Sequence, residues 1–567
     1  MKFRIRDNLN TMFSKSIKKL LSNILLLGFY VGLAQSSKKP NILFIMSDDH
    51  TSTAIGAYGG RLAKLNPTPT IDQLANEGML LENTFCNNAI CSPSRASILT
   101  GQYSSTNGVT GLGGRLPKEK QYLPIELKKA GYETAVIGKW HLGTMPLAFD
   151  YYKVMRSQGH YFNPIFTEKG QTIKEYKVGK KTEKGTIQNI GHSSDVIASS
   201  GIDWLQKRNA SKPFFLKLHF KAPHGPFSNA PRYDTYLEDV KIPEPDNYRD
   251  RKNNGSIATR GYNDELINFI GTSVDGRNKL RNNTSLIDRK LRQSLSDKEL
   301  TTKAYQVYLK KYLRCVKGVD DNVKLVIDHL KSEGLYDNTI IIYTGDQGFY
   351  LGEHNFIDKR WGYEEGMRMP FIIRYPKTIK AGTRSDAITE NVDFAPTILD
   401  FAGAEIPNQM QGKSFKHILE TGKEHKDWKQ EAYYHYQLHM AHHLNPAHIG
   451  IRTKDYKLLL FYGAKIKSTM PTTPPSWELY DLKKDPTEDN NVYSNPKYTK
   501  TIKDLKEKLK QLRKDYKLDG TDFAYNKVIN EYWDYSNDDY KKAIQISSEA
   551  KKSIPLDRKI KKNKKKH

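Results

Sequence analysis

The chain has 567 residues and a formal net charge of +27 at pH 7. Hydrophobic residues make up 37% and charged residues 27%, a balance that excludes a low-complexity chain and is typical of a globular protein. The length allows one large domain with a smaller companion. Three cysteines are too few for a disulfide framework.

The positive charge is concentrated at the two ends of the chain. About half of the excess lies in the first 34 residues and in residues 551–567. The charge that remains on the body of the chain attracts polyanions. Because the sequence contains no recognised nucleic-acid-binding motif, we expect a polyanion other than nucleic acid.

Residues 1–34 have the pattern of a signal peptide. A basic start is followed by an apolar stretch from Leu20 to Ala34 and then by polar residues. This stretch is short for a membrane span and has small residues near its end, as cleavage requires; an uncleaved anchor is the weaker alternative. We therefore expect an exported protein, periplasmic or secreted, without stable membrane insertion.

Five apolar, β-rich runs predict buried strands, and helical patterns lie between them. The strand runs are 41–46, 134–137, 214–220, 339–344 and 371–375, and the helical patterns are 71–77, 124–130 and 316–332. This alternation predicts an α/β fold with a large, mostly parallel sheet sandwiched by helices. In such folds ligands bind beyond the carboxyl ends of the strands.

Two changes of pattern divide the rest of the chain. Residues 228–300 are polar with weak periodicity and predict a variable insertion whose loops shape a substrate cleft. From residue 426, four strand-like runs and a charged helix at 499–516 predict a smaller C-terminal subdomain of antiparallel sheet and helix. We expect a main domain over 36–425, this subdomain over 426–535, and a basic, loose tail over 536–567.

The segment Cys91-Ser92-Pro93-Ser94-Arg95 predicts the start of a helix that carries functional side chains. Proline fits the first turn of a helix, so Cys91 lies at a helix N-terminus, where backbone N–H groups favour an anion. Arg95, one turn later, points back to the same place. A buried cysteine at a helix start is the simpler structural alternative.

This segment and Ala96–Gly101 resemble the signature of type I sulfatases, a family of the alkaline-phosphatase-like superfamily. Further segments resemble sulfatase segments in the same order: 41–49, 138–143, 223–226, 345–354, 363–376, 451–458 and 478–491. The likeness covers about residues 40–515 and is weakest between 228 and 300. It implies an alkaline-phosphatase-like fold and a catalytic sulfatase domain over 36–425.

The resemblance implies that Cys91 is converted to formylglycine (3-oxoalanine) by a maturation enzyme. The hydrated aldehyde offers two hydroxyls. One attacks sulfur and the alcohol departs; the second then loses its proton, and the covalent intermediate collapses to aldehyde and sulfate. A serine would lack the second hydroxyl.

A divalent cation is expected beside this group, to neutralise the sulfate and help ionise the diol. Oxygen ligands suit such a cation, and the candidates follow two of the predicted strands: Asp48, Asp49, Asp346 and the amide oxygen of Gln347, together with the modified Cys91. Many sulfatases have asparagine or histidine at the position of Gln347. We expect calcium because it tolerates irregular coordination; magnesium stays open.

Three cations correspond to family positions that hold the aldehyde hydrate or the sulfate oxygens: Arg95, Lys139 and Lys359. For Lys359 the alternative is a surface lysine.

Three histidines complete the candidate site. His141 corresponds to the residue that deprotonates the diol, and His224 to the proton donor for the leaving alcohol, roles that suit a pKa near neutrality. For His354, substrate contact and a structural role are both open.

The resulting hypothesis is a sulfatase that acts on a sulfated carbohydrate, such as ulvan, carrageenan or a glycosaminoglycan. One alternative is a phosphodiesterase or phosphonate monoester hydrolase of the same superfamily, because some of those also use formylglycine. The other is a non-catalytic glycan-binding protein on the same scaffold, which the full set of candidate catalytic residues argues against.

Overall fold

The computed structural model describes residues 39–178, 181–248, 255–259, 287–440, 445–463, 472–520 and 524–535, with 545, 546 and 549. The predicted signal peptide, much of the 228–300 insertion and most of the basic tail lie outside the described residues. Within them, no helix combines the length and hydropathy needed to cross a membrane.

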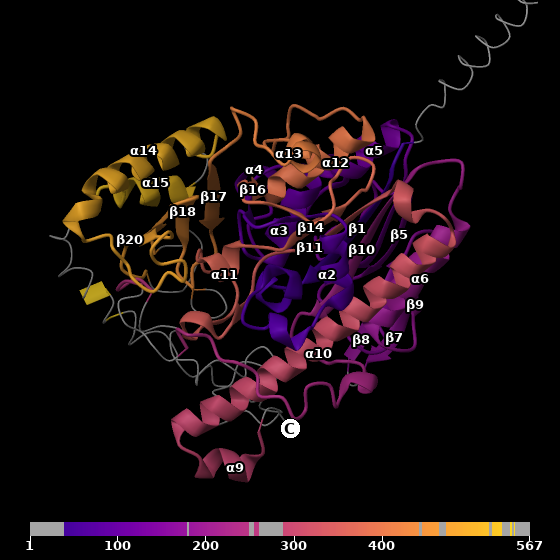
Figure 1. Cartoon of the computed structure of the whole chain (residues 1–567), viewed down its shortest axis with the longest axis horizontal. Helices are drawn as coiled ribbons and strands as arrows, with labels where there is room; N and C mark the ends of the chain where they lie inside the picture. The colour runs from indigo at the N-terminus through magenta and orange to yellow at the C-terminus, as the bar shows by residue number, and fades with distance from the viewer. Residues whose placement is uncertain are drawn as a thin grey trace, which may run out of the picture. The chain divides into compact units, whose positions relative to one another are not determined.

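A ten-stranded mixed sheet forms the centre, in the order β15-β2-β14-β11-β1-β10-β4-β5-β6-β9 (Figure 1). Its strands are β1 (Asn41–Asp48), β2 (Met79–Leu81), β4 (Glu133–Lys139), β5 (Tyr151–Met155), β6 (Ile165–Glu168), β9 (Ile187–Gln188), β10 (Phe214–Pro223), β11 (Thr339–Gly345), β14 (Phe371–Arg374) and β15 (Thr383–Ser385). The five middle strands, β11 to β5, are mutually parallel. β14, β2, β6 and β9 join by antiparallel pairing. The predicted α/β class is confirmed.

Helices cover both faces of this sheet. α2 (Pro69–Asn76), α6 (Ser193–Lys207) and α10 (Asp297–Ser332) pack on one face, and α3 (Cys91–Thr100), α5 (Tyr122–Lys129) and α12 (Phe394–Ala402) on the other. Successive residues of β1 alternate between the two cores, Leu43 and Ile45 into the first and Phe44 and Met46 into the second. Burial on both faces explains the continuous apolar runs of the middle strands.

The strand register brings four strand ends to one edge of the sheet. Ser47 pairs with Gly345 of β11, and Asp48 with Pro223 of β10. On the other side of β10, His219 pairs with Gly138, which directly precedes Lys139. Polar residues at these ends are therefore neighbours in space, although they are up to about 300 residues apart in sequence.

Parts of the chain depart from the sequence expectation. The strands β5 to β9, including the hairpin β7 (Lys174–Val178) and β8 (Lys181–Gly185), and helix α6 were not predicted. α10 begins at Asp297 instead of near 316, because Ser296 and Glu299 form a capping box there. It therefore starts inside the expected insertion, preceded by α9 (Arg289–Ser294).

Short elements connect the layers. They are β3 (Thr84–Phe85) paired with β16 (Thr389–Glu390), β12 (Tyr350–Leu351) paired with β13 (Ile357–Asp358), and the helices α4 (Ser104–Asn107), α11 (Glu364–Met367) and α13 (Lys416–Thr421).

The predicted C-terminal antiparallel sheet is present. It consists of β17 (Glu431–Tyr436), β18 (His448–Thr453), β19 (Tyr456–Phe461) and β20 (Ser476–Asp481), paired in chain order. α14 (Thr499–Asp515) covers it through buried Leu505 and Leu509, and α15 (Ala524–Glu531) lies beside α14 (Figure 1). The domain limits at 425 and 535 stay predictions.

Candidate active site

Two adjacent carboxylates end the central strand β1. Asp48 is buried, and its Oδ2 pairs with the Lys139 ammonium at the end of β4. Asp49 has a φ of 64°, held by its N–H, which donates to Asp346 Oδ1 at 3.1 Å, and by the Tyr312 hydroxyl of α10, which donates to its carbonyl at 2.7 Å. The left-handed backbone turns its carboxylate into the same space as that of Asp48.

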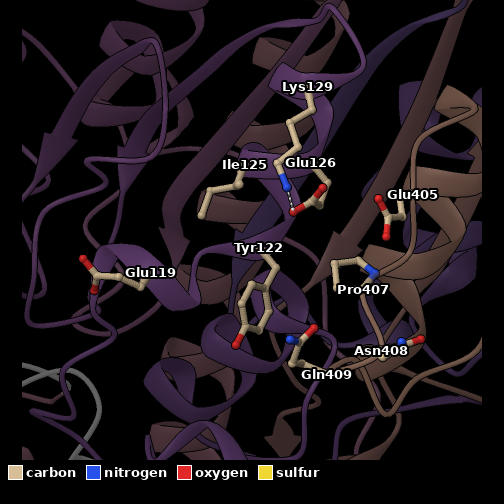
Figure 2. A pocket seen from close by; sticks show the side chains of 9 residues that line it. All are labelled: Glu119, Tyr122, Ile125, Glu126, Lys129, Glu405, Pro407, Asn408 and Gln409. Carbon is tan, nitrogen blue, oxygen red and sulfur yellow. Dashed lines mark hydrogen bonds and ion pairs between the residues drawn. The ribbon is translucent and has the colours of Figure 1, made fainter.

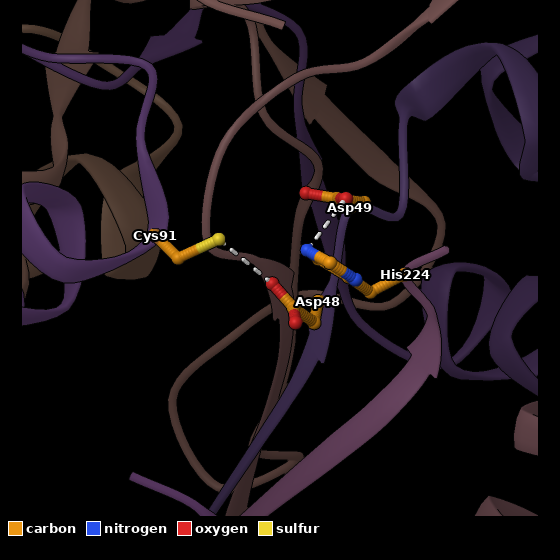
Figure 3. Close-up of side chains that lie close together, drawn as sticks. All are labelled: Asp48, Asp49, Cys91 and His224. Carbon is orange, nitrogen blue, oxygen red and sulfur yellow. Dashed lines mark hydrogen bonds and ion pairs between the residues drawn. The ribbon is translucent and has the colours of Figure 1, made fainter. Parts of the chain in front are cut away.

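Cys91 is the first residue of α3 and points at these carboxylates (Figure 3). Its Sγ lies 3.2 Å from Asp48 Oδ1 and 3.2 Å from the Lys359 Nζ. Burial and the charge of Asp48 raise the pKa of the thiol well above its usual value. The unmodified thiol is therefore neutral and a weak nucleophile.

Arg95 ties α3 to the strand ends. Its Nε donates to Asp346 Oδ2 at 3.0 Å, its Nη1 donates to the Lys139 carbonyl at 2.7 Å, and its Nη2 lies 3.6 Å from Asp48 Oδ1. The Ser94 hydroxyl also donates to the Asp346 carbonyl. The first turn of α3 is thus fixed against β1, β4 and β11.

Burial and neighbouring charges shift the pKa values of the three carboxyl groups in different directions. Burial acts to raise the pKa of Asp48, but Lys139 and other nearby cations hold it well below its usual range. Burial raises the pKa of Asp49 to about 7, against the pull of the Lys359 ion pair. Burial and Asp48 raise the pKa of Asp346. Crowding of three buried carboxylates favours a bound cation.

The structure brings His224 and His141 to the same edge. His224 Nε2 lies 3.7 Å from Asp49 Oδ2 (Figure 3), and its Nδ1 is bonded to the Gly225 carbonyl at 2.8 Å. His141 follows β4 with a φ of 58°, and its carbonyl accepts a hydrogen bond from Ser92 at 2.6 Å, beside Cys91. Burial, then Lys139, lowers the pKa of both imidazoles.

The donor set fits a hard cation. Ligand atoms of Asp48, Asp49, Cys91 and His224 all lie within 4.8 Å of one another. Gln347, next to Asp346, donates its amide N–H to Asp49 Oδ1, while its carbonyl Oε1 is buried without a hydrogen-bond partner among the described residues. A cation beside Asp49 would use that oxygen.

His354 lies in a different environment from the other predicted site residues. Its side chain is 1% exposed, 3.5 Å from Glu365 Oε2, and its ring contacts Tyr350, Phe356 and Tyr363. The ligand atoms of His354, Glu365 and Glu488 form a second close group. The sequence left substrate contact and a structural role open for His354; its aromatic neighbours fit the structural role, and the assignment stays a prediction.

Two further residues belong to the site although the sequence analysis did not single them out. Gln158, in the loop after β5, accepts a hydrogen bond from Lys139 through Oε1 at 2.5 Å. Lys221 of β10 is 3% exposed, and burial lowers its pKa to about 8. Lys221 directly follows the predicted strand run 214–220, and that place at a strand end was the signal that could have identified it.

A surface pocket elsewhere has the wrong chemistry for an anion. It has a volume of about 370 Å³ and lies between α5 and residues 405–409 (Figure 2). Glu119, Glu126 and Glu405 line it, and Lys129 is paired with Glu126 at 2.8 Å. The excess of carboxylates would repel a sulfate.

Comparison with known proteins agrees with this geometry. The family model "Sulfatase" matches residues 40–404, and the model "N-sulphoglucosamine sulphohydrolase, C-terminal" matches residues 352–515. The chain is 39% identical over 520 residues to an N-acetylglucosamine-6-O-sulfatase of Bacteroides thetaiotaomicron, covering 86% of this chain and 88% of that protein. It is 27% identical over 496 residues to an ulvan-active sulfatase of Formosa agariphila, covering 83% and 79%.

One solved structure has the same fold as this chain and a similar sequence. It is described as a complex with its substrate D-glucosamine-2-N,6-O-disulfate, and it matches with a TM-score of 0.75 and 38% identity over 85% of this chain and 98% of that one. The chain therefore belongs to the sulfatase family, within the alkaline-phosphatase-like superfamily. It is accordingly an enzyme of the sulfuric ester hydrolase class, as the sequence predicted.

Proposed function

We propose that this enzyme removes the 6-O-sulfate from glucosamine-type residues of a sulfated carbohydrate. The observation that carries the proposal is Cys91, held between Asp48 and Lys359 at 3.2 Å from each, at the start of a buried helix. The 39% identical relative is named for this sulfate position. The 38% identical structure is described with a 6-O-sulfated glucosamine.

The nucleophile in this proposal is Cys91 after oxidation to formylglycine by a maturation enzyme. The raised pKa of the thiol supports a need for modification, because a neutral buried thiol attacks poorly. The helix start and the Lys359 ammonium favour negative charge that develops on the modified side chain.

Asp48, Asp49, Asp346 and Gln347 would hold a calcium ion together with the modified Cys91. When bound, a hard divalent cation supplies charge neutralisation at the sulfate oxygens. The orphaned Gln347 Oε1 and the crowded carboxylates support this ligand set. Calcium is proposed over magnesium because the calcium ion tolerates irregular coordination by a mixed set of carboxylate and amide oxygens, whereas magnesium requires near-octahedral geometry.

Three basic residues bind the sulfate group in this proposal. Arg95, Lys139 and Lys359 stabilise the sulfate oxygens, and their pairing with Asp346, Asp48 and Asp49 holds them in place without a bound substrate.

The two histidines move protons. His224 donates to the leaving alcohol, since its Nδ1 is anchored on a backbone carbonyl and its Nε2 faces Asp49. His141, with an unpartnered buried Nδ1, accepts the proton that allows sulfate release.

Export completes the proposal. Residues 1–34 would act as a signal peptide and deliver the enzyme to the periplasm or the medium, where sulfated polysaccharides are found. The positive charge of the body would attract such a polyanion.

The test is a desulfation panel of matched sugars. We expect enzyme from a host that modifies Cys91, supplied with calcium, to release sulfate from glucosamine 6-O-sulfate faster than from its 3-O isomer, ulvan oligosaccharides or the matched phosphate ester. Cys91→Ala should fold with unchanged circular dichroism and release no sulfate from any of them. Preferred release of phosphate, or turnover that survives in Cys91→Ala, would refute the proposal.

A further inference from the structure

Lys221 is a buried cation that the proposed mechanism does not use. It lies near the end of β10 and is 3% exposed. Among the described residues, its ammonium makes no hydrogen bond and no ion pair. The ammonium lies over the ring of Tyr161, 5.0 Å from the ring centroid. A buried ammonium without an anionic partner is costly, so an anion has to complete its surroundings.

The surroundings of Lys221 connect it to the reaction pocket. Burial and Lys139 lower the pKa of its ammonium, whereas Asp48, Asp49 and Cys91 raise it. The carbonyl of Lys221 accepts the N–H of His224 at 3.0 Å, and the Tyr161 hydroxyl donates to the His224 carbonyl. The backbone of Lys221 therefore lies in the turn that holds the proposed proton donor, and the Tyr161 ring that contacts its ammonium also anchors that turn.

Lys217 provides a matched comparison on the same strand. Side chains alternate along a strand, so Lys217 and His219 share one face of β10, whereas Lys221 lies where the register with β1 shifts between Phe220 and Pro223. Lys217 is 1% exposed and stacks on Phe44 at 4.6 Å, and the neighbouring charge that acts on it is Arg95. Lys217 thus packs against the core that contains Phe44, whereas Lys221 packs against Tyr161 in the core on the other face of the sheet.

We propose that Lys221 is an additional sulfate-binding residue, whose ammonium pairs with an oxygen of the sulfate group in the reaction pocket. The inference rests on the proposed function for the identity of the anion. Asp48, Asp49 and Asp346 are already paired with Lys139, Lys359 and Arg95. Lys221 has no such carboxylate pair among the described residues, so its ammonium adds positive charge for a bound anion beside the charges of those three cations.

The experiment measures binding of inorganic sulfate to the calcium-loaded enzyme by calorimetry, with chloride at equal ionic strength as the reference. Lys221→Met keeps the chain length and removes the charge. We expect it to weaken sulfate binding about tenfold, as the loss of a charged hydrogen bond does. Lys221→Arg should restore most of the affinity, and Lys217→Met should bind sulfate like the native enzyme.

Kinetics separate sulfate contact from other roles. Lys221→Met should lower kcat/KM by a similar factor for alkyl and aryl sulfates, because a contact to the sulfate group is independent of the leaving alcohol. Unchanged sulfate affinity, an equal loss in Lys217→Met, or a loss that grows with the pKa of the leaving alcohol would overturn the inference. Should Lys221→Met fail to fold, Lys221→Gln replaces it.

The inference and the proposed function fail separately. If the native enzyme hydrolyses no sulfate ester, the proposed function is wrong, while the binding comparison still decides whether Lys221 holds sulfate. If the native enzyme desulfates sugars and Lys221→Met binds sulfate normally, only the inference is wrong.

Discussion

At the residue scale, His224 has the assignment most open to a kinetic test. Burial and the cations Lys139, Lys359 and Lys221 lower the pKa of its imidazole in the free enzyme, whereas Asp48 raises it. Binding of an anionic sulfate ester adds negative charge beside it and favours the protonated form. The histidine is thus prepared to donate once substrate is present.

We predict that His224→Ala slows alkyl sulfates by about 10²- to 10⁴-fold, the usual range for loss of a general acid. Activated aryl sulfates should slow far less, because their leaving groups need no proton. The measurement is kcat/KM across esters of graded leaving-group pKa. The same slowing for every ester would remove the proton-donor assignment.

Sequence reasoning selected residues that the structure places close together, since Asp48, Lys139 and Asp346 lie at strand ends and Cys91 begins a helix in a recognisable segment. It missed Lys221, because the same strand also contains Lys217, and only the residues that β1 and β4 place beside each lysine distinguish the two. It left His354 open because one short loop holds both it and Lys359, and only packing shows that His354 is buried among aromatic rings.

At the element scale, one helix caps another. Asp320 lies in the middle of α10, and its carboxylate accepts the N–H groups of Thr70 at 3.0 Å and Ile71 at 2.9 Å, at the N-terminus of α2. Asp320 therefore caps a helix that lies some 250 residues away in the sequence.

We predict that Asp320→Ala lowers the free energy of unfolding by about 1–2 kcal/mol, the usual value of a helix cap. Asp320→Asn should lose less, because its amide oxygen still accepts a hydrogen bond. Burial raises the pKa of Asp320 to about 6, so ionisation of this carboxyl is less favourable in the folded protein than in the unfolded chain. Thermal melts measure the effect, and an equal loss in both variants would contradict the capping role.

Elements with a strong local sequence pattern could be predicted. Elements whose position or direction depends on pairing with other strands could not. The apolar runs of β1, β10 and β11 and the four strands of the C-terminal sheet match the expected positions within a few residues. β6 and β9 are short and partly polar, and they pair at the sheet edge by antiparallel contacts that no local pattern encodes. The direction of β14 likewise depends on its pairing with β11.

At the scale of the whole molecule, the candidate metal site joins β1, β11 and α3. Binding a cation there stabilises the native state over the unfolded chain, in which Asp48 and Asp346 are far apart. The same linkage predicts that stability depends on the concentration of free calcium.

We predict that removal of metal with a chelator lowers the melting temperature, and that calcium restores it more effectively than magnesium. At a free calcium concentration of a hundred times Kd the gain is about 2.7 kcal/mol. Differential scanning calorimetry provides the measurement. Asp346→Ala should lose the calcium response, and a response that survives in this variant would place the ion elsewhere.

The burial of α3 has a consequence for the biogenesis of the enzyme. Every residue from Cys91 to Thr100 is buried, and Cys91 is 1% exposed. A second enzyme has no access to that thiol in the finished fold. Under the proposed function, oxidation of Cys91 therefore has to occur on the nascent or still-unfolded polypeptide, and a molecule that folds first keeps an unmodified thiol.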